Sequence, residues 1–125
     1  MKSVKGLIKE LLTRGVDRLY PNRAAFENIL SKRKIKVYCG YDPSSPALHL
    51  GHLITFLKLS QLQELGHKVV MLLGDFTGMI GDPTGKSLSR KKLTRKEVEK
   101  NAKNYQKKFY SPFLRHNYWS QKGFD

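Results

Sequence analysis

Two histidines separated by two residues are the part of the sequence best suited to chemistry on a phosphate group. His49 and His52 follow a proline-rich loop, residues 42–46, and stand where a helix is expected to begin. A spacing of three places both imidazoles on one face of the first helical turn. Backbone N–H groups and the positive end of the helix dipole favour phosphate there. Two imidazoles could then donate hydrogen bonds to phosphate oxygens as charge builds in a transition state.

Gly51, between the histidines, would let a bulky ligand approach the backbone. Two other interpretations of this pair stay open, a zinc half-site and two ordinary surface histidines. Zinc normally takes four ligands, and no third ligand stands near this pair in the sequence, so no metal site is predicted.

The glycine-rich segment 74–86 does not match the known phosphate-binding loops. A Walker A loop has four residues between its first glycine and Gly-Lys-Ser, whereas three residues separate Gly81 from Gly85. No G-x-G-x-x-G dinucleotide motif occurs. Asp82, between a glycine and a proline, is a fixed carboxylate suited to an ammonium group, although an aspartate that caps a turn would look the same.

The charge of the chain is concentrated in its two ends. The net charge is +14, with ten basic residues against three acids in residues 1–37 and twelve against three in residues 86–125. The centre, residues 38–85, holds two basic residues and four acids. This pattern favours a small-molecule site beside a surface that faces a polyanion, while a solubilising surface remains the alternative.

Composition points to the cytoplasm. A single cysteine, Cys39, cannot form an internal disulfide and fits a reducing compartment. The longest uninterrupted apolar run, residues 69–73, is far shorter than the roughly 20 residues of a membrane-spanning helix. The N-terminus is basic and amphipathic, but Glu10 and Asp17 disfavour a transit peptide. No membrane association is expected.

The hydrophobic periodicity predicts an α/β protein. The expected elements are a helix that buries Leu7, Ile8, Leu11 and Leu12 and stops at Gly15, a helix over 23–31 capped by Asn22, a strand over 35–39, a buried helix over 49–65 stopped by Gly66, and an apolar strand over 69–73. Strand, helix and strand in this order form a βαβ unit.

A last helix is expected after residue 94. Thr94 and Glu97 form a capping box. The inner stripe of this helix would be Val98, Ala102, Tyr105 and Phe109, with a lysine-rich outer face. We divide the chain into an N-terminal helical segment (1–34), the first half of a doubly wound, Rossmann-like parallel sheet (35–110), and an irregular tail of unknown role (111–125).

Four segments together resemble the tyrosyl-tRNA synthetases in order and spacing. They are YCGYDP at 38–43, LHLGHL at 48–53, GH at 66–67, and the glycine-rich run at 74–85. The resemblance covers about residues 35–110. The histidine signature marks class I synthetases in general, whereas YCGYDP and GDFTGMIGDPTG resemble the tyrosyl enzymes specifically.

The resemblance implies a two-step reaction. Tyrosine is activated by ATP, carrying Mg²⁺ on the nucleotide, to tyrosyl-adenylate, and the tyrosyl group then moves to tRNA-Tyr. It further implies a homodimeric full-length enzyme in the cytoplasm. The residues it assigns to ATP are Cys39, Gly40, Asp42, Ser44, His49, Gly51, His52 and Thr55. Those it assigns to tyrosine are Tyr38, Thr77 and Asp82, and those it assigns to catalysis are His49, His52, Lys86 and Arg90.

This sequence also departs from the family. The second half of the nucleotide fold, the lysine-rich signature loop and the anticodon-binding region are missing, so we expect a truncated fragment that is inactive alone. Lys86–Arg90 resembles the signature loop but lies on the wrong side of the fold. Two other hypotheses are a small nucleotidyltransferase that uses the HxGH motif, and a basic RNA-binding fragment without catalysis.

Overall fold

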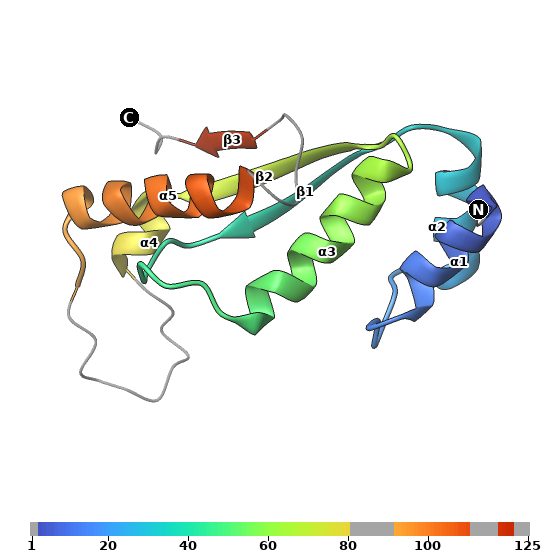
Figure 1. Ribbon diagram of the computed structural model, residues 1–125, viewed down its shortest axis with the longest axis horizontal. Coiled ribbons are helices and arrows are strands. Elements are labelled where there is room, and N and C mark those ends of the chain that lie inside the picture. Colours follow the sequence, from blue (N-terminus) through green and yellow to red (C-terminus); the bar gives the residue numbers. More distant parts are fainter. Residues whose placement is uncertain (1–2, 81–91, 111–117, 122–125) are drawn as a thin grey trace.

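The fold is α/β, as the sequence predicted. The computed structural model describes residues 3–80, 92–110 and 118–121. The elements are α1 (Val4–Thr13), α2 (Arg23–Lys32), β1 (Lys36–Tyr41), α3 (Leu50–Glu64), β2 (Lys68–Gly74), α4 (Phe76–Ile80), α5 (Arg95–Tyr110) and β3 (Tyr118–Gln121) (Figure 1). The three strands form one parallel sheet in the order β1-β2-β3.

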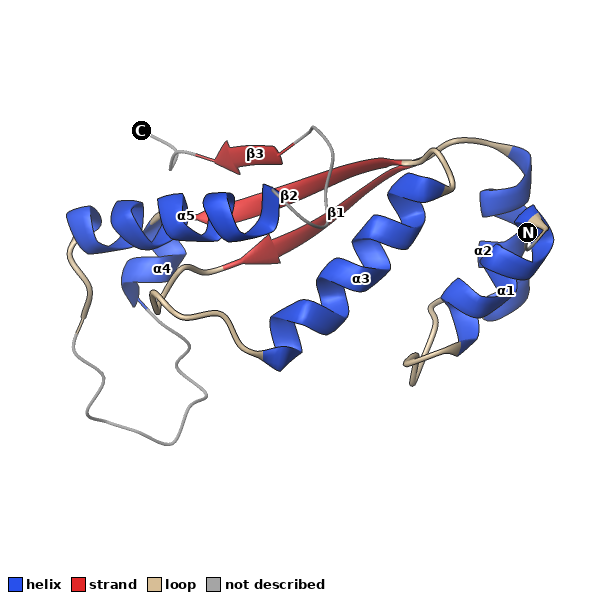
Figure 2. Ribbon diagram, viewed as in Figure 1, coloured by secondary structure: helices blue, strands red, loops and turns tan. Residues whose placement is uncertain are grey.

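Helices α3 and α5 pack against one face of the sheet (Figure 2). Cys39 of β1 pairs with Met71 of β2, and Tyr41 pairs with Leu73. Partners in a parallel ladder point to the same side, so these four side chains share one face. Met71 and Leu73 are buried there against the helices, in a cluster that includes Phe56, Tyr105, Ala102 and Leu48.

A second core joins α1 and α2 to the end of α3. Its buried members are Ile8, Leu11, Leu12, Leu30 and Leu65. Lys58 of α3 strengthens this junction, because its Nζ donates a hydrogen bond of 2.7 Å to the carbonyl of Leu11 in the last turn of α1. The helical segment therefore sits at one end of the sheet, remote from α4 (Figure 1).

The predicted helix boundaries are confirmed where a capping residue defined them. The Asn22 side chain accepts a hydrogen bond of 2.9 Å from the N–H of Ala25 and begins α2. Glu97 accepts hydrogen bonds from the N–H and hydroxyl of Thr94, which completes the capping box before α5. Gly66 ends α3 with a φ of 83°, a conformation that favours glycine.

Helix α3 is less buried than its composition predicted. Phe56 and Leu59 are buried, but Leu50, Ile54 and Leu57 remain 77%, 55% and 45% exposed. The prediction of a helix buried on nearly every side is wrong for this chain, because the described elements cover only one side of α3. The apolar composition of a helix does not say which neighbours will cover it.

Two segments have more regular structure than expected. The glycine-rich stretch contains a short helix, α4, which is not among the elements expected from the sequence. Residues 118–121 form β3, a parallel neighbour of β2, so the description of 111–125 as irregular does not hold for these four residues. A strand of four residues is too short to show a clear period in the sequence.

His67 is a buried titratable group between α3 and β2. It is 3% exposed, and its Nδ1 accepts a hydrogen bond of 3.3 Å from the N–H of Ile35. Burial first, and the charge of Lys34 second, lower the pKa of His67 below its ordinary value of 6.5. The folded state therefore holds this ring neutral, whereas the unfolded chain takes up a proton more readily as the pH falls.

We expect the fold to lose stability as the pH falls from about 7.5 to about 5.5. The contribution of His67 is complete above its unfolded pKa and is lost below it, because the unfolded state then binds more protons. His67→Asn keeps an acceptor for Ile35 but cannot titrate, so its melting temperature should fall less over the same range. Thermal melting of both proteins at several pH values measures this, and an equal fall in both would contradict it.

Candidate active site

His49 and His52 form a compact pair at the first turn of α3. His49 is the N-cap residue, and its Nδ1 accepts a hydrogen bond of 3.2 Å from the N–H of Gly51. The Nδ1 of His52 accepts a hydrogen bond of 3.2 Å from the N–H of His49. The ring centroids are 4.0 Å apart. The prediction that both imidazoles share one face of this turn is confirmed.

These hydrogen bonds determine which ring nitrogens carry protons. A nitrogen that accepts an N–H has no proton of its own, so each neutral ring must carry its proton on Nε2. Burial first, and the charge of His49 second, lower the pKa of His52, which keeps that ring neutral at pH 7. In their neutral forms the two rings therefore offer Nε2–H donors beside the helix N-terminus.

Aromatic side chains hold His52 in place. The ring centroid of His52 lies 6.1 Å from that of Tyr41, 6.2 Å from that of Phe56 and 5.7 Å from that of Tyr105. The Tyr41 hydroxyl donates to Thr55 Oγ1 at 2.8 Å, and Thr55 Oγ1 donates to the carbonyl of His52 at 2.8 Å. Thr55, predicted to bind ATP, thus also ties the end of β1 to the first turns of α3.

Helix α5 holds the loop between β1 and α3. Asn101 is 7% exposed, and its Nδ2 donates a hydrogen bond of 2.9 Å to the carbonyl of Pro43, which is fully buried. Burial first, and the charge of Asp42 second, raise the pKa of Tyr105, so the Asp42 carboxylate acts on this ring. Sequence reasoning missed Asn101; its polar side chain within the apolar stripe from Val98 to Tyr105 was the available signal.

Asp42 and Thr77 meet at the carboxyl ends of β1 and β2. The Thr77 hydroxyl donates a hydrogen bond of 2.5 Å to Asp42 Oδ1. Gly74 makes this approach possible, because a Cβ at that position would collide with both the Thr77 hydroxyl and the Asp42 carboxylate. The structure therefore joins one residue assigned to ATP with one assigned to tyrosine. Ligands of open parallel sheets bind at this edge.

The remaining predicted residues of β1 lie on both faces of the strand. Cys39 is half-buried on the face that the helices cover, whereas Tyr38 is 70% exposed on the opposite face. Gly40 is exposed, and no atom lies within 4 Å of where its Cβ would be. Ser44 is exposed, and its N–H donates to the carbonyl of Asp42 at 2.7 Å. Tyr38 is thus separated from Cys39 by the sheet.

Gly51 has a local partner that the sequence did not reveal. A Cβ at this position would approach Cε1 and Nδ1 of His49 to 3.0 Å, so the glycine makes room for the histidine ring as well as for any ligand. Three other predicted site residues, Asp82, Lys86 and Arg90, lie outside the described residues.

The described residues contain neither a metal-binding cluster nor a membrane-spanning helix. No three His, Cys, Asp or Glu side chains in residues 3–80 and 92–108 gather as a metal ion would require. No helix in the described part of the chain is long and apolar enough to cross a membrane.

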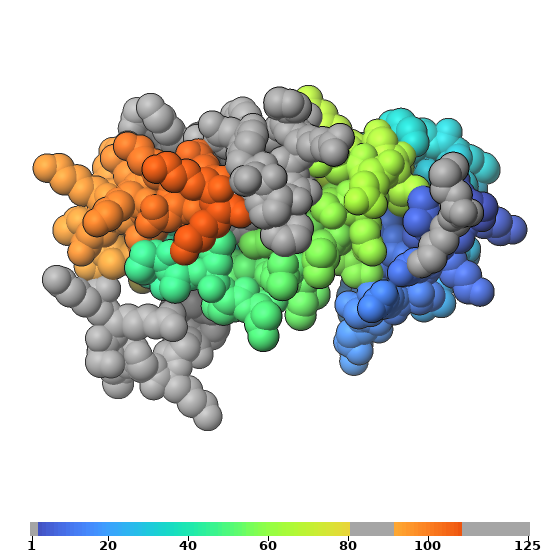
Figure 3. All heavy atoms as spheres, viewed as in Figure 1, coloured from blue at the N-terminus to red at the C-terminus, as the bar shows by residue number. Residues whose placement is uncertain are grey.

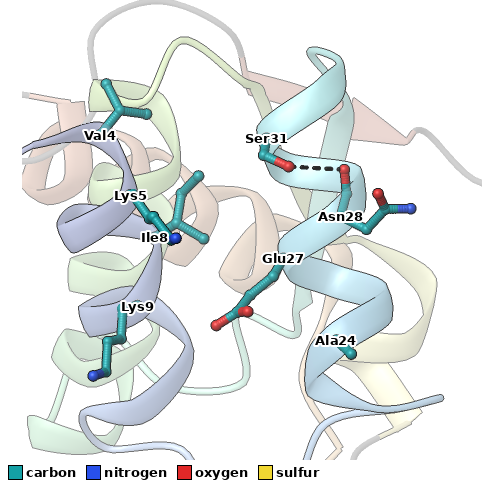
Figure 4. A pocket seen from close by; sticks show the side chains of 8 residues that line it. All are labelled: Val4, Lys5, Ile8, Lys9, Ala24, Glu27, Asn28 and Ser31. Atoms are coloured by element: carbon teal, nitrogen blue, oxygen red, sulfur yellow. Dashed lines mark hydrogen bonds between the residues drawn. The ribbon is translucent and has the colours of Figure 1, made fainter.

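An open cavity of about 800 Å³ lies elsewhere, between α1 and α2 (Figure 4). Lys5 and Lys9 line one wall and Glu27 lines the other. No residue of α3 or of the strands lines it, so it is separate from the histidine pair.

The model of the family "tRNA synthetases class I (W and Y)" matches residues 30–122. The chain belongs to this family. The match extends beyond the part, residues 35–110, in which the sequence motifs were recognised.

Curated relatives and solved structures make the similarity more specific. The chain is 48% identical over 99 residues to a tyrosine–tRNA ligase of Thiobacillus denitrificans, covering 79% of this chain and 25% of that protein. It is 44% identical over 114 residues to tyrosine–tRNA ligase 2 of Clostridium acetobutylicum, covering 88% of this chain and 28% of that protein. The chain thus spans about a quarter of the length of the curated relatives it matches.

The solved structures show the same catalytic fold. A C-terminally truncated mitochondrial tyrosyl-tRNA synthetase of Coccidioides posadasii matches with a TM-score of 0.63 at 29% identity, covering 83% of this chain and 26% of that one. The corresponding Aspergillus nidulans protein, at 22% identity and a TM-score of 0.67, supports the fold over 96% of this chain and 37% of that one. The prediction of a Rossmann-like half-sheet is confirmed.

We expect Gly74→Ala to destabilise the site edge by about 1–3 kcal/mol, because the new methyl group must displace Thr77 and Asp42. Gly40→Ala is the matched control, a β1 glycine with open space around its Cβ position. It should change stability by less than about 1 kcal/mol. Urea denaturation of both variants measures this, and equal effects would show that the close approach at Gly74 is unimportant.

Proposed function

We propose that this chain provides the ATP-activating part of a tyrosine–tRNA ligase. Tyrosine would attack the α-phosphate of ATP to give tyrosyl-adenylate and pyrophosphate, and the tyrosyl group would then pass to tRNA-Tyr. The observation that carries the proposal is the histidine pair, whose Nδ1 atoms are occupied by backbone N–H groups and whose Nε2–H groups remain as donors at the start of α3.

The nucleotide would lie along the carboxyl ends of β1 and β2. The two Nε2–H groups, beside the positive end of the α3 dipole, would bind phosphate oxygens, most strongly as charge accumulates in the transition state. Cys39, Gly40, Asp42 and Ser44, with Gly51 and Thr55, would line the ATP side. Mg²⁺ would arrive bound to the nucleotide. His49 and His52 would stabilise the charge of the bound nucleotide through hydrogen bonds from Nε2–H, without transferring a proton.

The tyrosine would lie on the side of Tyr38 and Thr77. Tyr38 is exposed on the uncovered face of β1, where its hydroxyl is free to meet a phenol. Thr77 already reaches the Asp42 carboxylate, so the amino-acid and nucleotide subsites would share this edge. Asp82 would take the substrate ammonium, and Lys86 and Arg90 would act near pyrophosphate or the tRNA end.

The wider setting follows from the relatives. They are named tyrosine–tRNA ligases, which supports tyrosine and tRNA-Tyr as partners beside ATP. The homodimeric assembly and the cytoplasmic location are proposed on the resemblance of the motifs to the tyrosyl-tRNA synthetases. Because the chain spans about a quarter of their length, we expect the 125-residue polypeptide alone to show no tyrosine-dependent pyrophosphate exchange.

A chimera tests the function directly. Residues 30–110 of this chain replace the matching segment of the Thiobacillus denitrificans ligase, and ATP–pyrophosphate exchange is measured with tyrosine and, as a control, with tryptophan. We expect exchange that depends on tyrosine. Exchange that depends on tryptophan would mean that tryptophan, and not tyrosine, is the amino acid activated. RNA binding without any exchange would favour the hypothesis of a non-catalytic RNA-binding fragment.

The histidine roles have their own matched pair of variants. A glutamine amide nitrogen stands near the place of Nε2, whereas an asparagine amide stands near Nδ1. In the chimera, His49→Asn or His52→Asn should lower adenylate formation by ten- to a thousandfold, about 1.4–4 kcal/mol. The corresponding glutamine variants should retain at least about tenfold more activity.

Tyrosine affinity should hardly change in these four variants, since the lost interaction strengthens only in the transition state. Pre-steady-state adenylate formation and equilibrium tyrosine binding provide the two readouts. Equal rates of adenylate formation in the asparagine and glutamine variants would show that the Nε2–H groups have no role in the reaction.

Tyr38→Phe tests the amino-acid side. We expect the preference of the chimera for tyrosine over phenylalanine to narrow by about tenfold, because a polar partner of the substrate hydroxyl has been removed. The ratio of kcat/KM for the two amino acids is the measurement. An unchanged ratio would place Tyr38 outside the tyrosine pocket.

A further inference from the structure

Four lysines form a single row along the outer face of α5. Lys96, Lys100, Lys103 and Lys107 follow at intervals of four, three and four residues, which places them on one side of the helix. All four are exposed, and the opposite side of α5 is packed on the sheet. Figure 3 shows α5 at the surface of the molecule. We call these four residues the lysine row.

No member of the lysine row forms a salt bridge within the described part of the chain. Glu97 is held by the N–H and hydroxyl of Thr94, and Glu99 lies 3.4 Å from Arg95. Like charges three or four residues apart repel one another on a helix, so a polyanion bound along the row would relieve repulsion among its lysines. A solubilising surface would instead alternate acids and bases.

The shape of the row fits a nucleic-acid backbone. The eleven steps from Lys96 to Lys107, at about 1.5 Å rise each, span about 16 Å. A nucleic-acid strand carries one phosphate per roughly 3.4 Å of helix axis. An anionic membrane fits less well, because a helix that lies on a membrane inserts an apolar face. The apolar face of α5, with Val98 and Tyr105 each 1% exposed, is already used by the protein core.

We propose that the lysine row binds the sugar–phosphate backbone of RNA, independently of base sequence. The identity of that RNA as tRNA rests on the proposed function, whereas the surface itself rests on the geometry of α5. The row lies on the same helix whose inner side holds Pro43 through Asn101, so bound RNA and the ATP-side loop would share one rigid support.

The test is filter binding of the 125-residue chain to unfractionated tRNA over a series of salt concentrations. Lys100→Gln/Lys103→Gln removes two charges from the row, and Lys5→Gln/Lys9→Gln removes two exposed charges with the same helical character from α1. If both row lysines contact phosphates, the first variant should reduce the slope of log K against log salt by about 2. The α1 variant should leave the slope nearly unchanged.

Folding is checked by circular dichroism, and the row variant should keep or gain helix content because repulsion is removed. Three results would overturn the proposal: no tRNA binding by the parent chain, equal slope changes in both variants, or row-dependent binding only to phosphatidylserine vesicles. The chimera assay of tyrosine exchange needs no RNA. If the chimera shows no exchange but the salt slope depends on the row lysines, the proposed function is rejected and the RNA surface stands. If the chimera shows exchange but the salt slope does not depend on these lysines, the RNA surface is rejected and the proposed function stands.

Discussion

The hydrogen bonds that close the first turn of α3 through two histidine rings are the interaction on which the site depends. They satisfy backbone N–H groups that a helix start leaves unpaired, and in doing so they occupy both Nδ1 atoms. The same contacts that begin the helix therefore aim the Nε2–H groups outward. Capping and the proposed phosphate recognition are two consequences of one local geometry.

That geometry is maintained by contacts from distant parts of the chain. Tyr41 reaches Thr55 from the end of β1, Tyr105 packs against His52 from α5, and Asn101 fixes the carbonyl of Pro43. Helix α5 lies more than forty residues after the histidines, yet it supports both the loop before them and one of the rings. A change on its inner face would thus alter the position of the histidine pair without any direct contact with a ligand.

The sequence predicted what local rules determine and missed what distant contacts determine. The caps at Asn22 and Thr94, the βαβ order and the shared face of the histidines depend on residues close in sequence, and all are confirmed. The roles of Tyr41 and Asn101 depend on elements brought together by the fold: a polar residue within an apolar stripe marks Asn101 but does not identify its partner, Pro43. Residues 118–121 form a strand because they pair with β2, and the hydrophobic pattern of these four residues alone does not predict it.

In the part of the chain that the structure describes, helices cover one face of the sheet only, and the exposed apolar surfaces follow from this. Val69, Met71 and Leu73 point to the covered face and are buried, whereas Val70 and Leu72, between them, are only half-buried. Tyr38 belongs to this second face, and Leu50, Ile54 and Leu57 leave a side of α3 open as well. Since apolar strands of parallel sheets are normally covered on both faces, the second face is where additional chain in the longer relatives has apolar surface to bury. A tyrosine pocket built around Tyr38 would then have one wall from this sheet and its other wall from that additional chain.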